Sequence, residues 1–213
     1  MNRRITHRVA PTARENGSRG ARLRRAGRKL AIAAMTVLML LPQGVPLRAQ
    51  SSPTVEYQVK AAFLLNFARF VEWPPDAFES DKTPIAFCVF RQNPFGSALD
   101  DITDGKTINN RGLLVRHIQE LPDLKSCQIV FVSDAEDQYL PAILDTLKAS
   151  SALVVGESDR FAERGGGIQF YLEAEKVRFS VNVDATKSAR LNVSSKLLAL
   201  ARIVHDASPA KGN

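Results

Sequence analysis

The chain has 213 residues, of which 45% are hydrophobic, and its formal net charge is +7 at pH 7. The charge is unevenly distributed, because the first 49 residues hold 11 of the 29 basic side chains and only 1 of the 22 acidic ones. The remaining residues carry 18 basic and 21 acidic side chains, a net charge of −3. That balance excludes the basic surface of a nucleic-acid-binding protein.

The first 49 residues have the order of an export signal. Basic residues precede the apolar run 30–41 (LAIAAMTVLMLL), and Ala49 supplies the small residue that signal peptidase prefers. A membrane anchor is the alternative, but this run of 12 residues falls short of the roughly 20 needed to span a bilayer. We therefore predict a signal peptide over residues 1–49, cleavage near Gln50 and a periplasmic mature protein.

A short lead-in, residues 50–56, precedes a helix rich in phenylalanine. Ser52 is the predicted N-cap and Pro53 the first helical residue. The Trp-Pro-Pro sequence at 73–75 ends the helix, because a residue before proline avoids the α region. Helical spacing predicts one wide apolar face. Its members are Val55, Val59, Phe63, Phe67 and Phe70.

The middle of the mature chain alternates between strands and helices. Apolar runs at 85–90, 113–118, 128–132 and 152–155 predict four strands. A turn at 93–96 leads into a short helix, and Ser133 or Asp134 begins another helix that runs through Leu147. Residues 105–112 and 122–126 are predicted loops.

The C-terminal part is predicted as a hairpin followed by a long helix. Residues 167–172 and 177–183 form two strands joined by a tight turn at 173–176. One helix is expected from about 185 to 204, and residues 205–213 form a polar, flexible tail. The whole pattern predicts an α/β fold. We expect a single domain over residues 57–204, with a mixed sheet of about six strands flanked by helices.

Sequence motifs of catalysis and cofactor binding are absent. The chain has no G-x-S-x-G sequence, phosphate-binding loop, zinc-protease motif or C-x-x-C pair. His117 and His205, the two histidines of the mature chain, have no partner at metal-ligand spacing. The Gly165–Gly167 triplet precedes a strand, so we interpret it as a turn that needs positive φ. We expect no enzymatic activity, no metal and no cofactor.

The chain has two cysteines, Cys88 in the first predicted strand and Cys127 at the start of the third. In an exported protein, two cysteines are more often bridged than free. The alternative is that both are small buried hydrophobic residues, because bridging requires the two strands to lie close together.

Several motifs occur along the chain in a characteristic order. They are VKAAFLLNFARFVEWP, NPFG, CQIVFVS, FAERGGGI, VRFSVNV and LNVSSKLLALA. Together they resemble the YfiR family of exported bacterial proteins, over residues 57 to about 204. The resemblance implies a periplasmic α/β protein, often dimeric and without known catalysis. It also implies a cysteine pair at Cys88 and Cys127.

The best-understood members of that family repress a membrane-bound diguanylate cyclase by binding its periplasmic sensing domain. This binding lowers cyclic di-GMP and biofilm formation. The resemblance therefore implies a regulatory protein whose partner is a transmembrane diguanylate cyclase or histidine kinase, with a homodimer possible. Two other functions stay open: a periplasmic small-ligand-binding protein of a sensory system, and a hydrolase. A deep pocket with convergent polar groups would favour the ligand-binding protein.

A set of residues is proposed for an interface or structural role, because they lie in the shared motifs. Glu72 ends an apolar helix face, and Arg178 lies between apolar strand neighbours. For these two, solvated charges of small energetic effect are the alternative. The full set is Phe63, Phe67, Glu72, Trp73, Gly165, Gly166, Gly167 and Arg178.

Overall fold

The computed structural model describes residues 54–207, and residues 1–53 and 208–213 lie outside the described part of the chain. The predicted signal peptide, most of the lead-in and the end of the predicted tail fall outside it. So do Ser52 and Pro53. The first described helix begins at Val55, with Thr54 rather than Ser52 as its N-cap residue.

Helices and strands alternate along the described residues, as the α/β prediction requires. The elements are α2 (Val55–Phe70), β1 (Val71–Glu72), η2 (Pro75–Ala77), β2 (Ile85–Phe90), α3 (Ala98–Thr103), β3 (Thr107–Ile108), β4 (Arg111–Ile118), η3 (Leu121–Ser126), β5 (Ile129–Val132), η4 (Asp134–Tyr139), α4 (Leu140–Leu147), β6 (Leu153–Gly156), β7 (Ile168–Glu173), β8 (Lys176–Asn182), α5 (Val183–Ser188), β9 (Asn192–Val193), α6 (Ser195–Leu198) and β10 (Arg202–Val204).

The main sheet has eight strands in the order β10-β8-β7-β6-β5-β2-β4-β3. All six predicted strands are present as β2, β4, β5, β6, β7 and β8. The short strands β3 and β10 extend the two edges, and β1 pairs with β9 in a separate two-stranded sheet. β4, β2, β5, β6 and β7 run parallel, whereas β7–β8 and β3–β4 are antiparallel, so the sheet is mixed as predicted.

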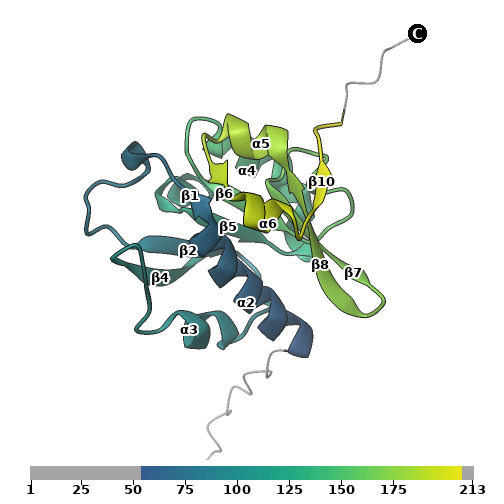
Figure 1. Cartoon of the computed structure of the whole chain (residues 1–213), viewed down its shortest axis with the longest axis horizontal. Coiled ribbons are helices and arrows are strands. Elements are labelled where there is room, and N and C mark those ends of the chain that lie inside the picture. The colour runs from purple at the N-terminus through teal and green to yellow at the C-terminus, as the bar shows by residue number, and fades with distance from the viewer. Residues whose placement is uncertain (1–53, 208–213) are drawn as a thin grey trace, which may run out of the picture. The chain divides into compact units, whose positions relative to one another are not determined.

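Two hydrophobic cores lie on opposite faces of this sheet. One face is covered by α2 and α3, whose side chains pack on alternate residues of the strands. The other face is covered by η3 and α4, together with the fully buried ring of Phe161. Figure 1 shows α2 crossing the first face, with α4 on the far side. Strands buried on both faces explain the continuous apolar run of β2.

The long C-terminal helix predicted over 185–204 is wrong. The segment instead contains α5, β9, α6 and β10. Arg190 has a φ of 60°, which no residue inside an α-helix adopts, and the side chain of Ser194 accepts a hydrogen bond from the backbone of Lys196 as a new N-cap. Leu191, which lies between α5 and β9, and Leu197, which lies in α6, are both buried.

Candidate interaction surface

The apolar face predicted for α2 is only partly buried. Phe67 is fully buried, Phe63 is half-buried, Val59 is 39% exposed and Val55 is 75% exposed. The buried side of the helix instead contains Lys60, Ala61, Leu64, Leu65, Phe67 and Ala68. The predicted Val and Phe face is therefore covered in its C-terminal half only, because the N-terminal half of α2 buries Lys60 rather than Val55 and Val59.

The C-terminal half of this face packs on the hairpin of β7 and β8. The Phe63 ring lies 5.4 Å from the Phe179 ring and 6.1 Å from the Phe170 ring, measured between centroids. Phe67 lies 5.1 Å from Phe179 in an edge-on arrangement. Such pairs add about 0.5–1.5 kcal/mol beyond area burial. These contacts fix α2 against the hairpin.

An exposed apolar strip continues outward from these aromatic contacts. Successive residues on one face of a strand are two apart, so Leu172 follows Phe170, and Val177 precedes Phe179. Leu172 pairs with Val177 in the hairpin register and is 57% exposed. Val59 and Val55 follow Phe63 on the same side of α2. We call Val55, Val59, Phe63, Leu172 and Val177 the apolar strip.

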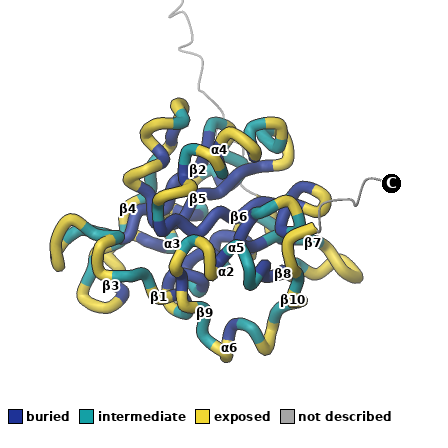
Figure 2. Tube along the Cα trace, turned by 90° about the horizontal axis from the view of Figure 1, so that it is seen from above, coloured by how far each residue is buried: buried dark blue, intermediate teal, exposed yellow. Residues whose placement is uncertain are grey.

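The two hairpin residues of the apolar strip, Leu172 and Val177, lie next to the tip of the hairpin. Ala174 and Glu175 both have positive φ, 48° and 60°, as in the two-residue turns that match the twist of paired strands. All residues from 172 to 176 are exposed. In Figure 1 the hairpin extends away from the sheet, and Figure 2 shows its tip as exposed.

Arg178 lies on the opposite face of the hairpin from the strip. Its guanidinium is 3.8 Å from the Glu173 carboxylate, which Arg202 also approaches at 3.4 Å. Arg202 stacks over the Tyr171 ring at 4.3 Å. Exposed ion pairs of this kind contribute little stability. Arg178 and the phenylalanines of α2 are therefore not brought together on one surface.

Glu72 and Trp73 lie where α2 ends. Glu72 belongs to β1 and accepts a hydrogen bond of 2.8 Å from the side chain of Asn192, its partner residue in β9. The indole nitrogen of Trp73 is buried and has no hydrogen-bond partner among residues 54–207. The contact between Glu72 and Asn192 ties the end of α2 to the C-terminal part of the chain.

The glycine triplet accommodates an aromatic ring. A Cβ added at Gly166 would lie 2.3 Å from the Phe161 ring, as would one added at Gly156. Phe161 therefore packs directly against backbone on both sides. Within the triplet, Gly165 has a φ of 100°, in agreement with the predicted turn of positive φ.

Cys88 and Cys127 form a disulfide, which confirms the pairing over the alternative of two free buried residues. Their Cα atoms are 5.9 Å apart and both residues are buried. Cys88 of β2 pairs in register with Val130 of β5, three residues after Cys127 along the chain. The bond therefore ties η3 and β5 to the centre of the sheet.

A buried ionic cluster at the carboxyl ends of the parallel strands was missed by sequence reasoning. Lys60 of α2 forms an ion pair of 2.5 Å with Glu157, which follows β6, and a second ion pair with Glu56. Glu157 also accepts hydrogen bonds from the Tyr57 hydroxyl at 3.1 Å and from the backbone of Asp134 at 3.2 Å. Burial, followed by the Glu157 charge, raises the pKa of Tyr57. A lysine within the apolar run YQVKAAFLL was the available signal.

A second polar group lies at the same edge of the sheet. Arg164 donates to Asp137, with one bond of 3.0 Å, and Ser158 donates to the same carboxylate. The Arg164 hydrogen bond is the main reason why the pKa of Asp137 lies below its ordinary value. The polar atoms in this group and in the Lys60 and Glu157 cluster are paired with one another. Both clusters are therefore suited to holding the loops at the carboxyl ends of the parallel strands in place.

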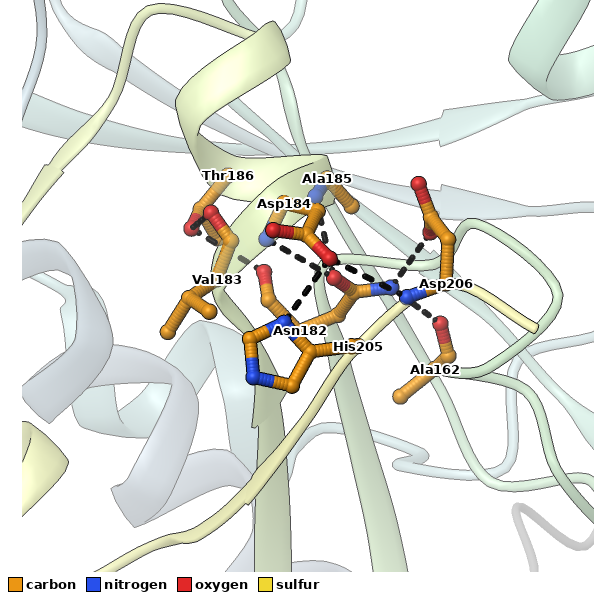
Figure 3. Close-up of polar contacts among 8 residues, drawn as sticks. All are labelled: Ala162, Asn182, Val183, Asp184, Ala185, Thr186, His205 and Asp206. Atoms are coloured by element: carbon orange, nitrogen blue, oxygen red, sulfur yellow. Dashed lines mark hydrogen bonds and ion pairs between the residues drawn. The ribbon is translucent and has the colours of Figure 1, made fainter. Parts of the chain in front are cut away.

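The residues after β10 are also held by polar contacts (Figure 3). His205 lies 2.9 Å from the Asp184 carboxylate, and its hydrogen bond lowers the pKa of Asp184. Asp206 accepts a 2.7 Å hydrogen bond from buried Asn182, and the backbone of Ala207 donates to Glu163. We call residues 205–207 the C-terminal clasp. The sequence predicts these residues to be part of a flexible tail.

Within residues 54–207, no helix is long and apolar enough to cross a membrane. The same part of the chain has no cluster of three or more His, Cys, Asp and Glu side chains that could hold a metal ion.

Comparison with known families places these features in context. Residues 57–202, well over half of the chain, match the family model DUF4154, described as YfiR/HmsC-like. This match confirms the resemblance inferred from the motifs. Among solved structures, the fold is similar to a conserved domain protein from Vibrio cholerae O1 biovar El Tor, with a TM-score of 0.43 and 10% sequence identity. That similarity covers 69% of this chain and 59% of the other.

Proposed function

We propose a regulatory function for this chain, which belongs to the YfiR/HmsC-like family. In this proposal the protein binds the periplasmic domain of a transmembrane signalling protein, a diguanylate cyclase in the first instance, and keeps it inactive. The match over residues 57–202 carries the proposal, because it spans nearly the whole described domain. Members of this family are generally regulatory proteins rather than enzymes.

The proposed site of action is the periplasm. The disulfide between Cys88 and Cys127 is of the kind that persists in oxidising compartments. The basic and apolar order of residues 1–49 also supports export, although those residues lie outside the described part of the chain. Recovery of a chain beginning near Gln50 from a periplasmic extract, by intact mass, tests this location.

The apolar strip is the proposed contact surface for the partner. It combines exposed aliphatic side chains with a rigid support, since Phe63 joins it to the packed rings below. A regulator shifts its partner only if it binds the inactive state more tightly than the active state. A tenfold shift requires about 1.4 kcal/mol of such difference, which burial of about 60 Å² of apolar surface supplies.

Gene deletion and surface variants test this function together. Deletion is expected to raise the cellular level of cyclic di-GMP, and reintroducing the wild-type gene is expected to lower it again. Genes carrying Val59→Glu or Leu172→Glu should fail to lower the level, whereas genes carrying Gln58→Glu or Leu114→Glu should lower it as the wild type does. Gln58 is an exposed neighbour on α2, and Leu114 is 45% exposed on the distant strand β4.

Crosslinking of the mature chain in membranes should capture a transmembrane partner for the wild type and for the two control variants. It should capture none for Val59→Glu or Leu172→Glu. Unchanged cyclic di-GMP in the deletion strain, with no membrane partner captured, would refute the proposed function. Light scattering of the purified domain tests separately whether the chain forms the homodimer that the family resemblance leaves open.

A further inference from the structure

A cavity of about 210 Å³ lies between α4 and the segment that contains α5. Its walls are mainly aliphatic, with Leu144 and Leu147 from α4, Leu153 from β6 and Leu191 from the loop after α5. Ala185 and Ala189 contribute small side chains that leave the space open. Apolar walls with a few polar groups are typical of small-molecule sites.

The glycine triplet forms one wall of this cavity. Gly165 and Gly167 both line it, and a Cβ added at Gly165 would lie 2.9 Å from the Leu144 side chain on the opposite wall. A Cβ at Gly167 would lie 3.0 Å from Leu153 and 3.6 Å from Thr186. Side chains at these positions would therefore narrow the space, so the triplet keeps the cavity open as well as accommodating Phe161.

One carboxylate is fixed at the rim of the cavity. Asp206 lines it, and the Asn182 side chain donates a 2.7 Å hydrogen bond to Asp206 Oδ1. Asn182 is itself held by a bond to the carbonyl of Ala162 at 2.6 Å, and its side-chain oxygen accepts from the backbone of Asp184 and Ala185 (Figure 3). Asn182 is fully buried, so the clasp places the Asp206 carboxylate in a defined position.

The charges at the rim indicate the chemistry of the ligand. Among the lining residues that lie within 54–207, Asp206 is the one acidic residue and Lys148 is the one basic residue. Lys148 is exposed at the end of α4, where a long side chain can turn to solvent. A pre-positioned charge binds better than one that must be ordered. We infer that this cavity binds a small organic amine, with the apolar part inside and the ammonium group at Asp206.

The cavity is separate from the proposed partner-binding surface. It lies between α4 and α5, whereas the apolar strip is on α2 and the hairpin. Asp206 also follows the last residue of the family match, residue 202. Amine binding and regulation of a membrane partner can therefore fail independently of one another.

Three probes of similar shape test this inference on the mature protein. Benzylamine, benzyl alcohol and benzoate share a ring and differ in charge. Calorimetric titration should give saturable binding of benzylamine, with a dissociation constant on the order of 1 mM for so small a ligand. Benzyl alcohol should bind several-fold more weakly, and benzoate more weakly still. Equal affinity for all three probes, or no saturable binding of benzylamine, would overturn the inference.

Two variants locate the binding. Asp206→Asn retains an acceptor for Asn182 but removes the charge. It should weaken benzylamine binding about threefold to fivefold, as expected for an ion pair at an exposed rim. It should leave benzyl alcohol binding unchanged. Ala189→Leu fills the cavity and should abolish binding of both probes. Asp159→Asn, which removes an exposed carboxylate outside the lining, is the matched control. Unchanged benzylamine affinity in Asp206→Asn contradicts the inference, even if Ala189→Leu fails to fold.

Discussion

Removal of the disulfide should lower the free energy of unfolding by about 4 kcal/mol. The bond closes a loop with a sequence separation of 39 residues between Cys88 and Cys127. In the chain-entropy treatment, a loop of this length restricts the unfolded chain by about 13 cal/mol/K, or about 4 kcal/mol at 25 °C. For a domain of this size, each kcal/mol shifts the melting temperature by about 2–4 °C, so the expected decrease is about 8–16 °C.

The assay is urea unfolding of the Cys88→Ala/Cys127→Ala double variant beside the wild type, with and without a phosphine reductant. Reductant should destabilise the wild type to about the level of the variant and leave the variant unchanged. The m-value should rise in the open forms, because their unfolded chains expose more surface. A loss below about 1 kcal/mol in both open forms would refute the reasoning, since strain or residual structure would then cancel the entropy of closure.

Three further results are expected. Lys60→Met should cost about 3 kcal/mol in urea unfolding, because it leaves the largely buried Glu157 carboxylate without its cationic partner; a loss under about 1 kcal/mol would contradict a buried ion pair. Gly166→Ala should cost about 1–3 kcal/mol, because its Cβ would lie 2.3 Å from a packed ring, whereas Gly112→Ala, with open space around it, should be nearly neutral. The depressed pKa of Asp137 means that its ionised form stabilises the fold above the ordinary value of 3.8, and that this contribution is lost as the pH falls through the lower folded pKa. Arg164→Met should therefore reduce the loss of stability on acidification below about pH 4, and an unchanged acid profile would exclude this role.

The strands could be predicted from the sequence because each is a short apolar run bounded by turn residues. Burial on both faces removes the alternation of polar residues, so the run 85–90 is recognisable by composition alone. The hairpin was also predictable, since its turn is polar and flanked by alternating apolar residues. Their order in the sheet was not predictable, because pairing depends on contacts between distant residues.

The C-terminal segment was mispredicted because helix propensity outweighed a weaker signal. Residues 185–204 are rich in Ala, Leu and Lys, which favour helix. Ser194 and Ser195 are poor interior helix residues but good N-caps, and Ser194 does cap α6. The strand β10 is stabilised only by pairing with β8, which no local pattern of Arg202–Val204 reveals.

The two departures of α2 from its predicted pattern have different causes and different consequences. Lys60 is buried although it is charged, because Glu157 and Glu56 neutralise it within the domain. Val55 and Val59 are exposed although they are apolar, and within residues 54–207 no element covers them. A buried charge that is fully paired is explained by the fold itself. The fold offers no such explanation for Val55 and Val59, which are exposed at helical spacing next to a packed aromatic cluster. The candidate contact surface is therefore placed at these residues rather than at the ionic cluster.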